Sequence, residues 1–249
     1  MILTLVVLYG LIFTSFFILL GTRIPKKESI TGRSHCDKCN KTIPWYGLTP
    51  VLGWFFVRGK CPSCGAKVSI KYPVYELFGG FLFGLSYFIL QDNLIEFMVT
   101  SIFFSLMIIV SVSDIEYHIV PDIVLVFFAP IIFILRMIYP LDTWFDALLG
   151  GVLAFSFLYL IAYYGKKKYG QDALGGGDIK LYFIIGLFLG AQLVFMSLFF
   201  AALLGIILGR SVLKKMNPIP FVPFIFGGVI ITYFIGQDLL TWYSSLFIG

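Results

Sequence analysis

Two aspartates of this sequence occupy positions where an acidic side chain is costly. Asp178 directly follows Gly175, Gly176 and Gly177 and opens an apolar stretch, while Asp114 follows another apolar stretch after a single serine. An ionised carboxylate beside hydrocarbon costs a few kcal/mol or more, so acids in such places indicate a functional site. Two carboxyl groups in one site share a proton, since both cannot ionise cheaply. One can then take a proton from water while the other polarises a carbonyl, which is the chemistry of an aspartyl protease.

The depth of both acids follows from helix geometry. Counted at 1.5 Å per residue, Asp178 lies about 21 Å from the turn near Gln192, and Asp114 lies about 27 Å from the loop at Glu96. Against a hydrocarbon core of about 30 Å, both are predicted near the same membrane boundary, facing one cavity. The glycine run admits irregular backbone angles and the close approach of another segment. Such backbone is tolerated at this depth only where protein or water covers it.

A simpler interpretation of these acids is helix capping. Asp is a favourable N-cap, and Asp178 precedes an apolar helix, so an isolated acid there could serve only as a cap. Asp122 fits the capping role better, and Glu116 and His118 are expected to face water in a loop. Lys180 either tunes the acidity of Asp178 or extends its amine to the interface.

The elements that must position these residues are membrane-spanning helices. The chain has 249 residues, of which 59% are hydrophobic and 12% charged, and its mean hydropathy of +0.97 excludes a soluble domain. The apolar residues form about eight runs, each near the roughly 20 residues that cross the bilayer as a helix. The runs cover approximately residues 2–21, 73–90, 97–113, 120–138, 145–163, 175–190, 193–209 and 219–236. The fold class predicted is therefore all-α, a polytopic helical membrane protein.

The charge distribution predicts the orientation of the chain. The first run is expected to be a retained span, because basic residues follow it and none precedes it. Of the 18 Lys and Arg residues, all but Arg136 lie on one side of the expected spans, in segments 22–72, 165–180 and 210–215. The positive-inside rule makes this side cytoplasmic and places both termini outside. The net charge of +5 thus reports topology, and no nucleic-acid partner is expected.

The one sizeable polar segment contains all four cysteines. They form two Cys-x-x-Cys pairs separated by the 21 residues from position 40 to position 60, and are Cys36, Cys39, Cys61 and Cys64. Four thiolates in this pattern predict a tetrahedral Zn²⁺ site, and a small loop with little core gains stability from it. The cytoplasm keeps thiols reduced, so disulfides are not expected. The zinc is predicted to be structural, because four thiolates leave no position for water; unligated cysteines are the alternative.

These observations divide the chain into three parts. They are a first transmembrane helix at 1–21, a cytoplasmic tetracysteine loop domain at 22–72 and a seven-helix membrane domain at 73–249.

Several short motifs run in order along nearly the whole chain. They are GRSHC at 32–36, RGKC at 58–61, YPVYE at 72–76, VSVSDIEYHIVPD at 110–122, GGGDIKL at 175–181 and IPFVPF at 219–224. Segment 175–181 resembles the GxGD segment of the type IV prepilin peptidases, a family of intramembrane aspartyl proteases. Segment 110–122 resembles the first aspartate motif of that family, which ends in Pro-Asp. Departures, such as Lys71 where Arg is usual, lie in the loop.

The resemblance implies an enzyme of the bacterial inner membrane that cleaves the basic leader of prepilins and pseudopilins at the cytoplasmic face. Asp114 and Asp178 would be its catalytic pair, with the glycine run and Lys180 supporting catalysis. Members with a tetracysteine loop also methylate the new N-terminus with S-adenosylmethionine. Arg33 and Glu76 are candidates for that second site, although Glu76 could equally be a cap or an ion-pair partner. The partners implied are prepilin substrates and membrane lipids.

Three alternatives remain open at this point. The protein could be a leader peptidase without methyltransferase activity. It could be a proton-coupled transporter, in which intramembrane acids relay protons, although no internal repeat supports this. It could also be a zinc-stapled assembly factor, in which the cysteines matter and the aspartates do not. Neither the pilin served nor the oligomeric state follows from the sequence.

Overall fold

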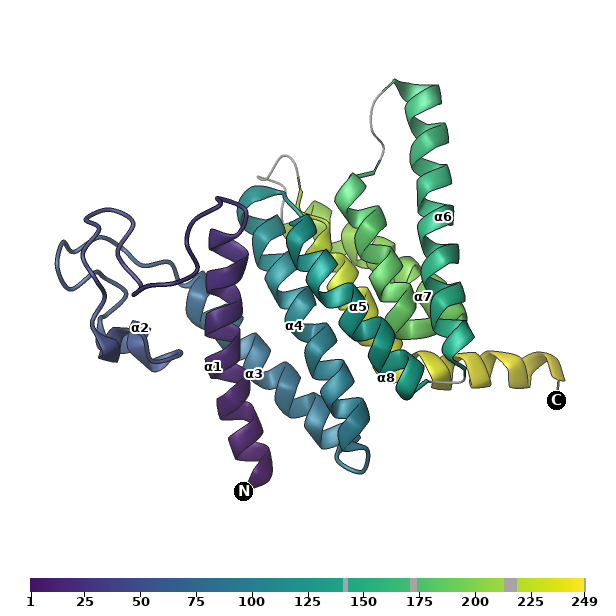
Figure 1. The fold of residues 1–249 in the computed structure, drawn as a ribbon, viewed down its shortest axis with the longest axis horizontal. Coiled ribbons are helices and arrows are strands. Elements are labelled where there is room, and N and C mark those ends of the chain that lie inside the picture. The colour runs from purple at the N-terminus through teal and green to yellow at the C-terminus, as the bar shows by residue number, and fades with distance from the viewer. Residues whose placement is uncertain (141–142, 171–173, 213–218, 249) are drawn as a thin grey trace. The chain divides into compact units, whose positions relative to one another are not determined.

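Outside the loop of residues 24–70, the described part of the chain is helical almost throughout (Figure 1). The computed structural model describes residues 1–140, 143–170, 174–212 and 219–248. The chain divides into two compact units, Met1–Val112 and Ser113–Gly249. Within the described residues, extended pairing is limited to two isolated antiparallel bridges in the cysteine-containing loop. The predicted all-α class is therefore confirmed.

The first unit is built on closely packed helices. Its long helices are α1 (Ile2–Arg23), α3 (Lys71–Leu90) and the greater part of α4 (Leu94–Tyr117). Glycines let α1 and α3 approach, as is typical of membrane helices. A Cβ at Gly10 would lie 2.9 Å from the Cβ of Phe83, and one at Gly79 would overlap the Thr14 hydroxyl. These glycines are therefore packing positions of the helix pair.

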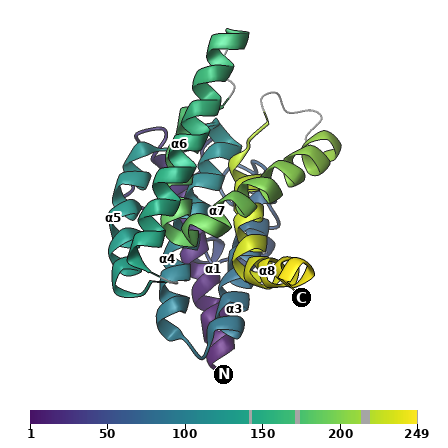
Figure 2. The same ribbon diagram turned by 90° about the vertical axis from the view of Figure 1, so that its right-hand side faces the viewer.

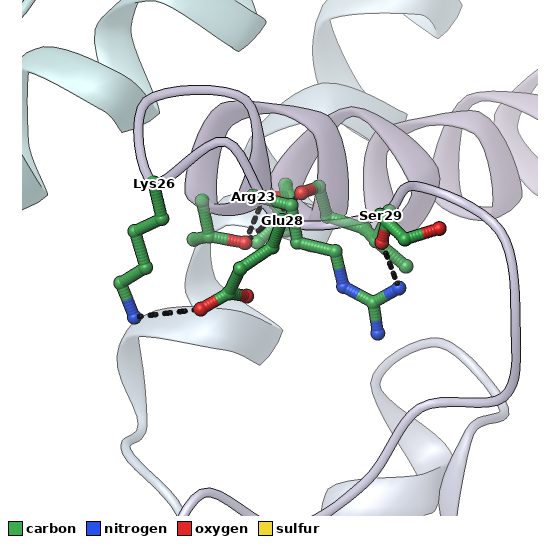
Figure 3. A network of polar contacts seen from close by, with 7 residues as sticks. Arg23, Lys26, Glu28 and Ser29 are labelled. Atoms are coloured by element: carbon green, nitrogen blue, oxygen red, sulfur yellow. Dashed lines mark hydrogen bonds and ion pairs between the residues drawn. The ribbon is translucent and has the colours of Figure 1, made fainter.

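Polar contacts close the turn by which the chain leaves α1 (Figure 3). The Glu28 N–H donates to the Arg23 carbonyl at 3.1 Å, and Arg23 Nη1 donates to the Ser29 carbonyl at 3.0 Å. Arg23 also stands in the last turn of α1, where a cation complements the helix dipole. The Lys26 amine lies 4.0 Å from the Glu28 carboxylate, and this half-exposed pair contributes little. The turn starts the loop domain at a defined point.

The loop between α1 and α3 has two short helical turns and a small aromatic centre. The turns are η1 (Trp45–Gly47) and α2 (Leu52–Phe56). The Trp54 indole N–H donates to the Val68 carbonyl at 3.1 Å. Gly59 has φ 61°, and a Cβ there would lie 2.8 Å from the Trp54 ring, so a glycine is required on both counts. Trp54 thus fixes the second half of the loop.

The described part of the second unit contains four further helices. They are α5 (Asp122–Ile138), α6 (Trp144–Tyr169), α7 (Gly176–Val212) and α8 (Val222–Ile248). α6 begins where the Thr143 side chain accepts the Asp146 N–H at 3.2 Å, and it ends at Gly170 in the left-handed conformation. Three lysines in its last turn complement the dipole. Figure 1 and Figure 2 show α6 alongside α7, with the C-terminal end of α6 extending past it.

α7 is two helical legs joined at one residue. Gly190 has φ 80° and ψ 177° inside the 37-residue element. The Tyr182 hydroxyl of the first leg lies beside the Ser197 side chain of the second, a pair that a straight helix would separate by about 22 Å. The two predicted runs 175–190 and 193–209 are therefore these two legs. The turn expected at residues 190–192 is tighter than a loop, because only Gly190 leaves the helical conformation.

The lengths of the helices fit a membrane protein. Among the described residues, six helices are long and apolar enough to cross a membrane, namely α1, α3, α4, α6, α7 and α8. α5 has 17 residues, or about 25 Å, and α7 contains two legs. Five of the predicted runs lie within one of these helices, and the other three begin one to three residues before α5, α7 and α8. The division at residues 21 and 72 depends on membrane topology and stays a prediction.

Candidate active site and metal centre

Asp114 lies buried in the last turn of α4. Its side chain is 7% exposed, and Oδ2 accepts the backbone N–H of Val222 at 2.9 Å. Val222 is the first residue of α8, so this N–H has no partner within its own helix. A carboxylate at a helix N-terminus also complements the dipole. Asp114 thus joins the end of α4 to the start of α8, two segments that are 108 residues apart in the chain.

The turn after α4 is held by a residue that the sequence analysis did not single out. The buried Ser113 hydroxyl donates to the Ile119 carbonyl at 2.5 Å, and the His118 N–H donates to the Asp114 carbonyl at 2.9 Å. His118 takes φ 55°, as the reversal of the chain requires. A serine directly before the first aspartate is the signal that could have indicated this role.

Asp178 lies in the first turn of α7, and its side chain is partly buried. The Gly175 carbonyl accepts the Asp178 N–H at 3.1 Å, and a Cβ at Gly175 would lie 3.1 Å from Asp178 Oδ2. A Cβ at Gly177 would lie 2.6 Å from the Cβ of Val120, whereas Gly176 has open space. The glycine run therefore starts the helix and permits close approach, with no left-handed residue among the three.

The structure places the two aspartates where the charge of one carboxylate acts on the other. The Asp114 and Asp178 carboxylates are near enough to repel each other. The contact of Gly177 with Val120 places the start of α7 against the turn that follows Asp114. Leu181, three residues after Asp178 in α7, is fully buried, and electrostatic interactions are stronger in such surroundings than in water. Two carboxyl groups in one such environment can serve as an acid and a base.

Lys180 forms an ion pair with Asp122. Its Nζ lies 2.8 Å and 2.9 Å from the two carboxylate oxygens, and the two side chains are 53% and 64% exposed. The pair joins the first turn of α7 to the first turn of α5. An exposed pair contributes little stability. Lys180 therefore connects two helix starts, with its charge directed to Asp122, and its supporting role in catalysis stays a prediction.

The four cysteines come together as predicted. Their sulfur atoms all lie within 4.8 Å of one another and could hold a metal ion. Cys36 and Cys64 have sulfurs 3.8 Å apart, and those of Cys39 and Cys61 are 4.0 Å apart. Ligands of a tetrahedral Zn²⁺ at about 2.3 Å have sulfurs about 3.8 Å apart. The donor set and its spacing therefore fit zinc.

The two halves of the cysteine cluster repeat one backbone pattern. The Asn40 N–H donates to the Cys36 carbonyl at 2.8 Å, and the Gly65 N–H donates to the Cys61 carbonyl at 2.9 Å. Both Asn40 and Gly65 have positive φ, as Asn and Gly tolerate best. The backbone N–H groups of Ser63 and Cys64 lower the pKa of Cys61 to about 7, whereas the pKa of Cys64, next to the other thiols, is raised to about 11.

The two methyltransferase candidates lie in different surroundings. Arg33 is exposed in the loop, whereas Glu76 is 8% exposed in α3. Glu76 Oε2 accepts the Val51 N–H at 2.7 Å, and Val51 has φ 60°, which is rare for a β-branched residue. Glu76 thus holds a strained turn of the loop at the start of α2. This contact resembles a capping carboxylate supplied from another helix.

Comparisons with known proteins cover both parts of the chain. Residues 8–90, which include the four cysteines and Glu76, match the bacterial peptidase A24 N-terminal domain. Residues 101–210, which include Asp114 and Asp178, match the type IV leader peptidase family.

Three relatives share one printed name, prepilin leader peptidase/N-methyltransferase. The Bacillus subtilis relative is 37% identical over 99% of this chain and 100% of its own length. Those of Myxococcus xanthus and Klebsiella pneumoniae are each 30% identical, over 80% and 78% of this chain and 60% and 88% of theirs. No solved structure matches the chain. With its buried aspartate, glycine-started helix and cysteine cluster in the matched segments, the chain belongs to the type IV leader peptidase family.

Proposed function

We propose that this protein is a membrane aspartyl endopeptidase that removes the basic leader of type IV prepilins or pseudopilins. The observation that carries the proposal is the pairing of Asp114 and Asp178 at the meeting point of three helix ends. Asp114 is fixed by the Val222 N–H, and Asp178 stands at the start of α7 within electrostatic range. The printed names of the relatives support the substrate class.

The reaction needs one ionised and one protonated carboxyl group. One carboxylate takes a proton from water, and the resulting hydroxide attacks the scissile carbonyl. The protonated partner donates a hydrogen bond to the carbonyl oxygen as its charge develops, and a proton then passes to the leaving amine. Asp114 Oδ2 is committed to the Val222 N–H. The shared proton is therefore carried on Asp178 or on the other oxygen of Asp114.

The proposed location is the bacterial inner membrane, with the aspartates near the cytoplasmic face and both termini outside. The charge bias supports this orientation. Arg136, the one basic residue on the other side, is 1% exposed within α5, so it contributes no charge to an outer loop. The anionic inner leaflet would attract the remaining basic residues.

We also propose that the cysteine cluster holds a structural Zn²⁺ and that the protein methylates the new N-terminus with S-adenosylmethionine. Cys36, Cys39, Cys61 and Cys64 would hold the metal, which would staple a loop with little core of its own. The second half of the relatives' printed name supports methylation. Arg33 and Glu76 remain the proposed residues for that activity, and Glu76 also anchors the loop.

The test compares Asp114→Asn and Asp178→Asn with Asp92→Asn, which makes the same change at an exposed loop aspartate. Each variant is purified in detergent and given a prepilin with a basic leader. Loss of acid–base catalysis should reduce cleavage by about 100-fold or more in both site variants and leave the control unchanged. Normal cleavage by either site variant overturns the proposal. Mass spectrometry of the processed N-terminus reports methylation separately, and metal analysis of a Cys36→Ser variant reports zinc.

A further inference from the structure

The break in α7 exposes backbone groups that other helices satisfy. At Gly190, the first leg loses partners for its last carbonyls and the second leg loses partners for its first N–H groups. Such groups must be satisfied by protein when they lie within a membrane. Gly190 is about 18 Å along the first leg from Asp178, so the break is remote from the proposed chemistry.

Two charged residues cover the two ends of the break. Arg136 Nε donates to the Phe188 carbonyl at 3.2 Å, and its guanidinium lies 4.8 Å over the Phe188 ring. Asp146 Oδ1 accepts the Ala191 N–H at 3.3 Å. The cation therefore stands at the C-terminal end of the first leg and the anion at the N-terminal start of the second, as both dipoles favour.

Close packing against α6 leaves little freedom at the break. A Cβ at Gly190 would overlap Asp146 Oδ2, and a Cβ at Gly150 would lie 2.8 Å from the Ala191 nitrogen. A Cβ at Gly186 would overlap the Gly150 backbone. α6 thus touches α7 on both sides of the break. Phe157 of α6 packs edge-to-face against Phe195 of the second leg, and Asp146 accepts the N–H of Ala191 at its start.

The two legs carry different halves of the proposed site. Asp178 stands on the first leg. The second leg packs on α8, because a Cβ at Gly228 would lie 2.6 Å from the Ser197 carbonyl. α8 begins at Val222, whose N–H holds Asp114. Phe188 of the first leg also contacts Tyr233 of α8, with ring centroids 5.0 Å apart, so α8 packs on both legs. The angle between the legs therefore contributes to how one aspartate lies relative to the group that fixes the other.

A small change in the angle between the two legs of α7 moves Asp178 by a large distance. Over the roughly 18 Å from the break to Asp178, a change of about 10° in the angle would move the start of one leg by about 3 Å. A displacement of about 1 Å is enough to cost about 100-fold in rate when reacting groups must be aligned.

We infer that Asp146 is a positioning residue for the catalytic pair, acting through the break at Gly190 and the second leg of α7 on the N–H that holds Asp114. The inference rests on the proposed function for its effect on rate. Its structural part, the coupling of Asp146 to the Val222 N–H, stands independently of the reaction.

The test uses three variants of the full chain. Asp146→Asn keeps the carbonyl acceptor for Ala191, whereas Asp146→Ala removes it and Asp146→Ser is too short to reach it. Asp92→Ala is the matched control. Each protein is assayed for kcat and KM with a prepilin substrate, and amide hydrogen exchange is followed by mass spectrometry over peptides that contain Ala191 and Val222.

The Ala and Ser variants should lose tenfold or more in kcat with KM within twofold, and the Asn variant should stay within threefold of the parent in both. Exchange should rise at Val222 as well as at Ala191, because the two are coupled. A rise confined to Ala191, or an unchanged kcat in a folded Ala or Ser variant, overturns the inference. If Asp114→Asn still cleaves normally, the proposed function fails instead, and the exchange result still decides the coupling. Should Asp146→Ala fail to fold, Asp146→Ser carries the same test.

Discussion

The two aspartates are the same residue type in different surroundings. Asp114 is buried and fixed by a backbone N–H, whereas Asp178 is partly buried in the first turn of a helix. Their pairing could be predicted from the sequence, because the position of each acid beside an apolar run set its depth. The contact of Asp114 with Val222 could not, since it joins residues 108 positions apart through the packing of the whole unit. A capping role does exist, but Asp114 caps α8, a helix that is distant in the sequence.

Glu76 offers a prediction about one buried carboxylate. Glu76→Ala should leave the Val51 N–H unpaired in its strained turn, at a cost of about 1–3 kcal/mol to the anchoring of the loop. Limited proteolysis of the loop should then be faster than in the parent protein. Glu76→Gln keeps a carbonyl acceptor and should protect the loop as the parent does.

The Gln variant also separates anchoring from cofactor binding. If the carboxylate charge holds S-adenosylmethionine, Glu76→Gln should cleave prepilin normally and fail to methylate it. Equal proteolysis rates for the Ala variant and the parent protein would show that Glu76 does not anchor the loop.

At the scale of elements, hydropathy predicted which segments become helices but not how α7 is joined. The sequence predicted a turn at residues 190–192, whereas the structure breaks the helix at Gly190 alone. Both connections leave the same pattern of apolar residues, so hydropathy does not distinguish them. The cysteine knuckles were more predictable, because the ligand spacing itself requires the tight turns. Their shared backbone pattern is readable in the sequence as Asn40 and Gly65, each four residues after the first cysteine of its pair.

The glycine run at the start of α7 gives a matched pair of substitutions. Gly177→Ala would place a Cβ 2.6 Å from the Cβ of Val120 and force the start of α7 away from the turn after Asp114. Overpacking of this kind costs about 1–3 kcal/mol, and here it displaces Asp178, so cleavage should fall tenfold or more. Prepilin cleavage and thermal unfolding in detergent measure the two effects.

Gly176→Ala is the control for this prediction. No atom lies within 4 Å of a Cβ there, so the helix should be stabilised by about 0.5–1 kcal/mol with cleavage unchanged. Equal loss of activity in both variants would mean that the run acts through its flexibility, contrary to the packing argument.

At the scale of the molecule, the burial of Arg136 sharpens the charge argument. A basic residue counts toward orientation only when it lies in a loop. Arg136 is instead buried in the second unit, where it donates a hydrogen bond to the Phe188 carbonyl beside the break in α7. Sequence alone could not make this distinction, because Arg136 stands near the end of an apolar run and close to the expected outer loop. With it removed from the count, the basic residues outside the helices favour one side without exception.

The number of crossings then becomes testable through α7. As one straight helix of 37 residues, α7 would be about 55 Å long and cross once, which would place the two ends of the chain on opposite sides of the membrane. As two legs it would return to its starting side, and under the proposed orientation α8 would then end outside, on the same side as Met1. Alkaline phosphatase fused after Gly249 should therefore be active in a bacterial host, because it folds only after export to an oxidising compartment. A fusion placed after Gly65, in the cysteine loop, should be inactive. A third fusion after Pro140 should be active if α5 crosses the membrane, because α5 also sets the parity of the spans that follow the loop. With that fusion active and the loop fusion inactive, an inactive fusion after Gly249 would contradict the two-leg crossing.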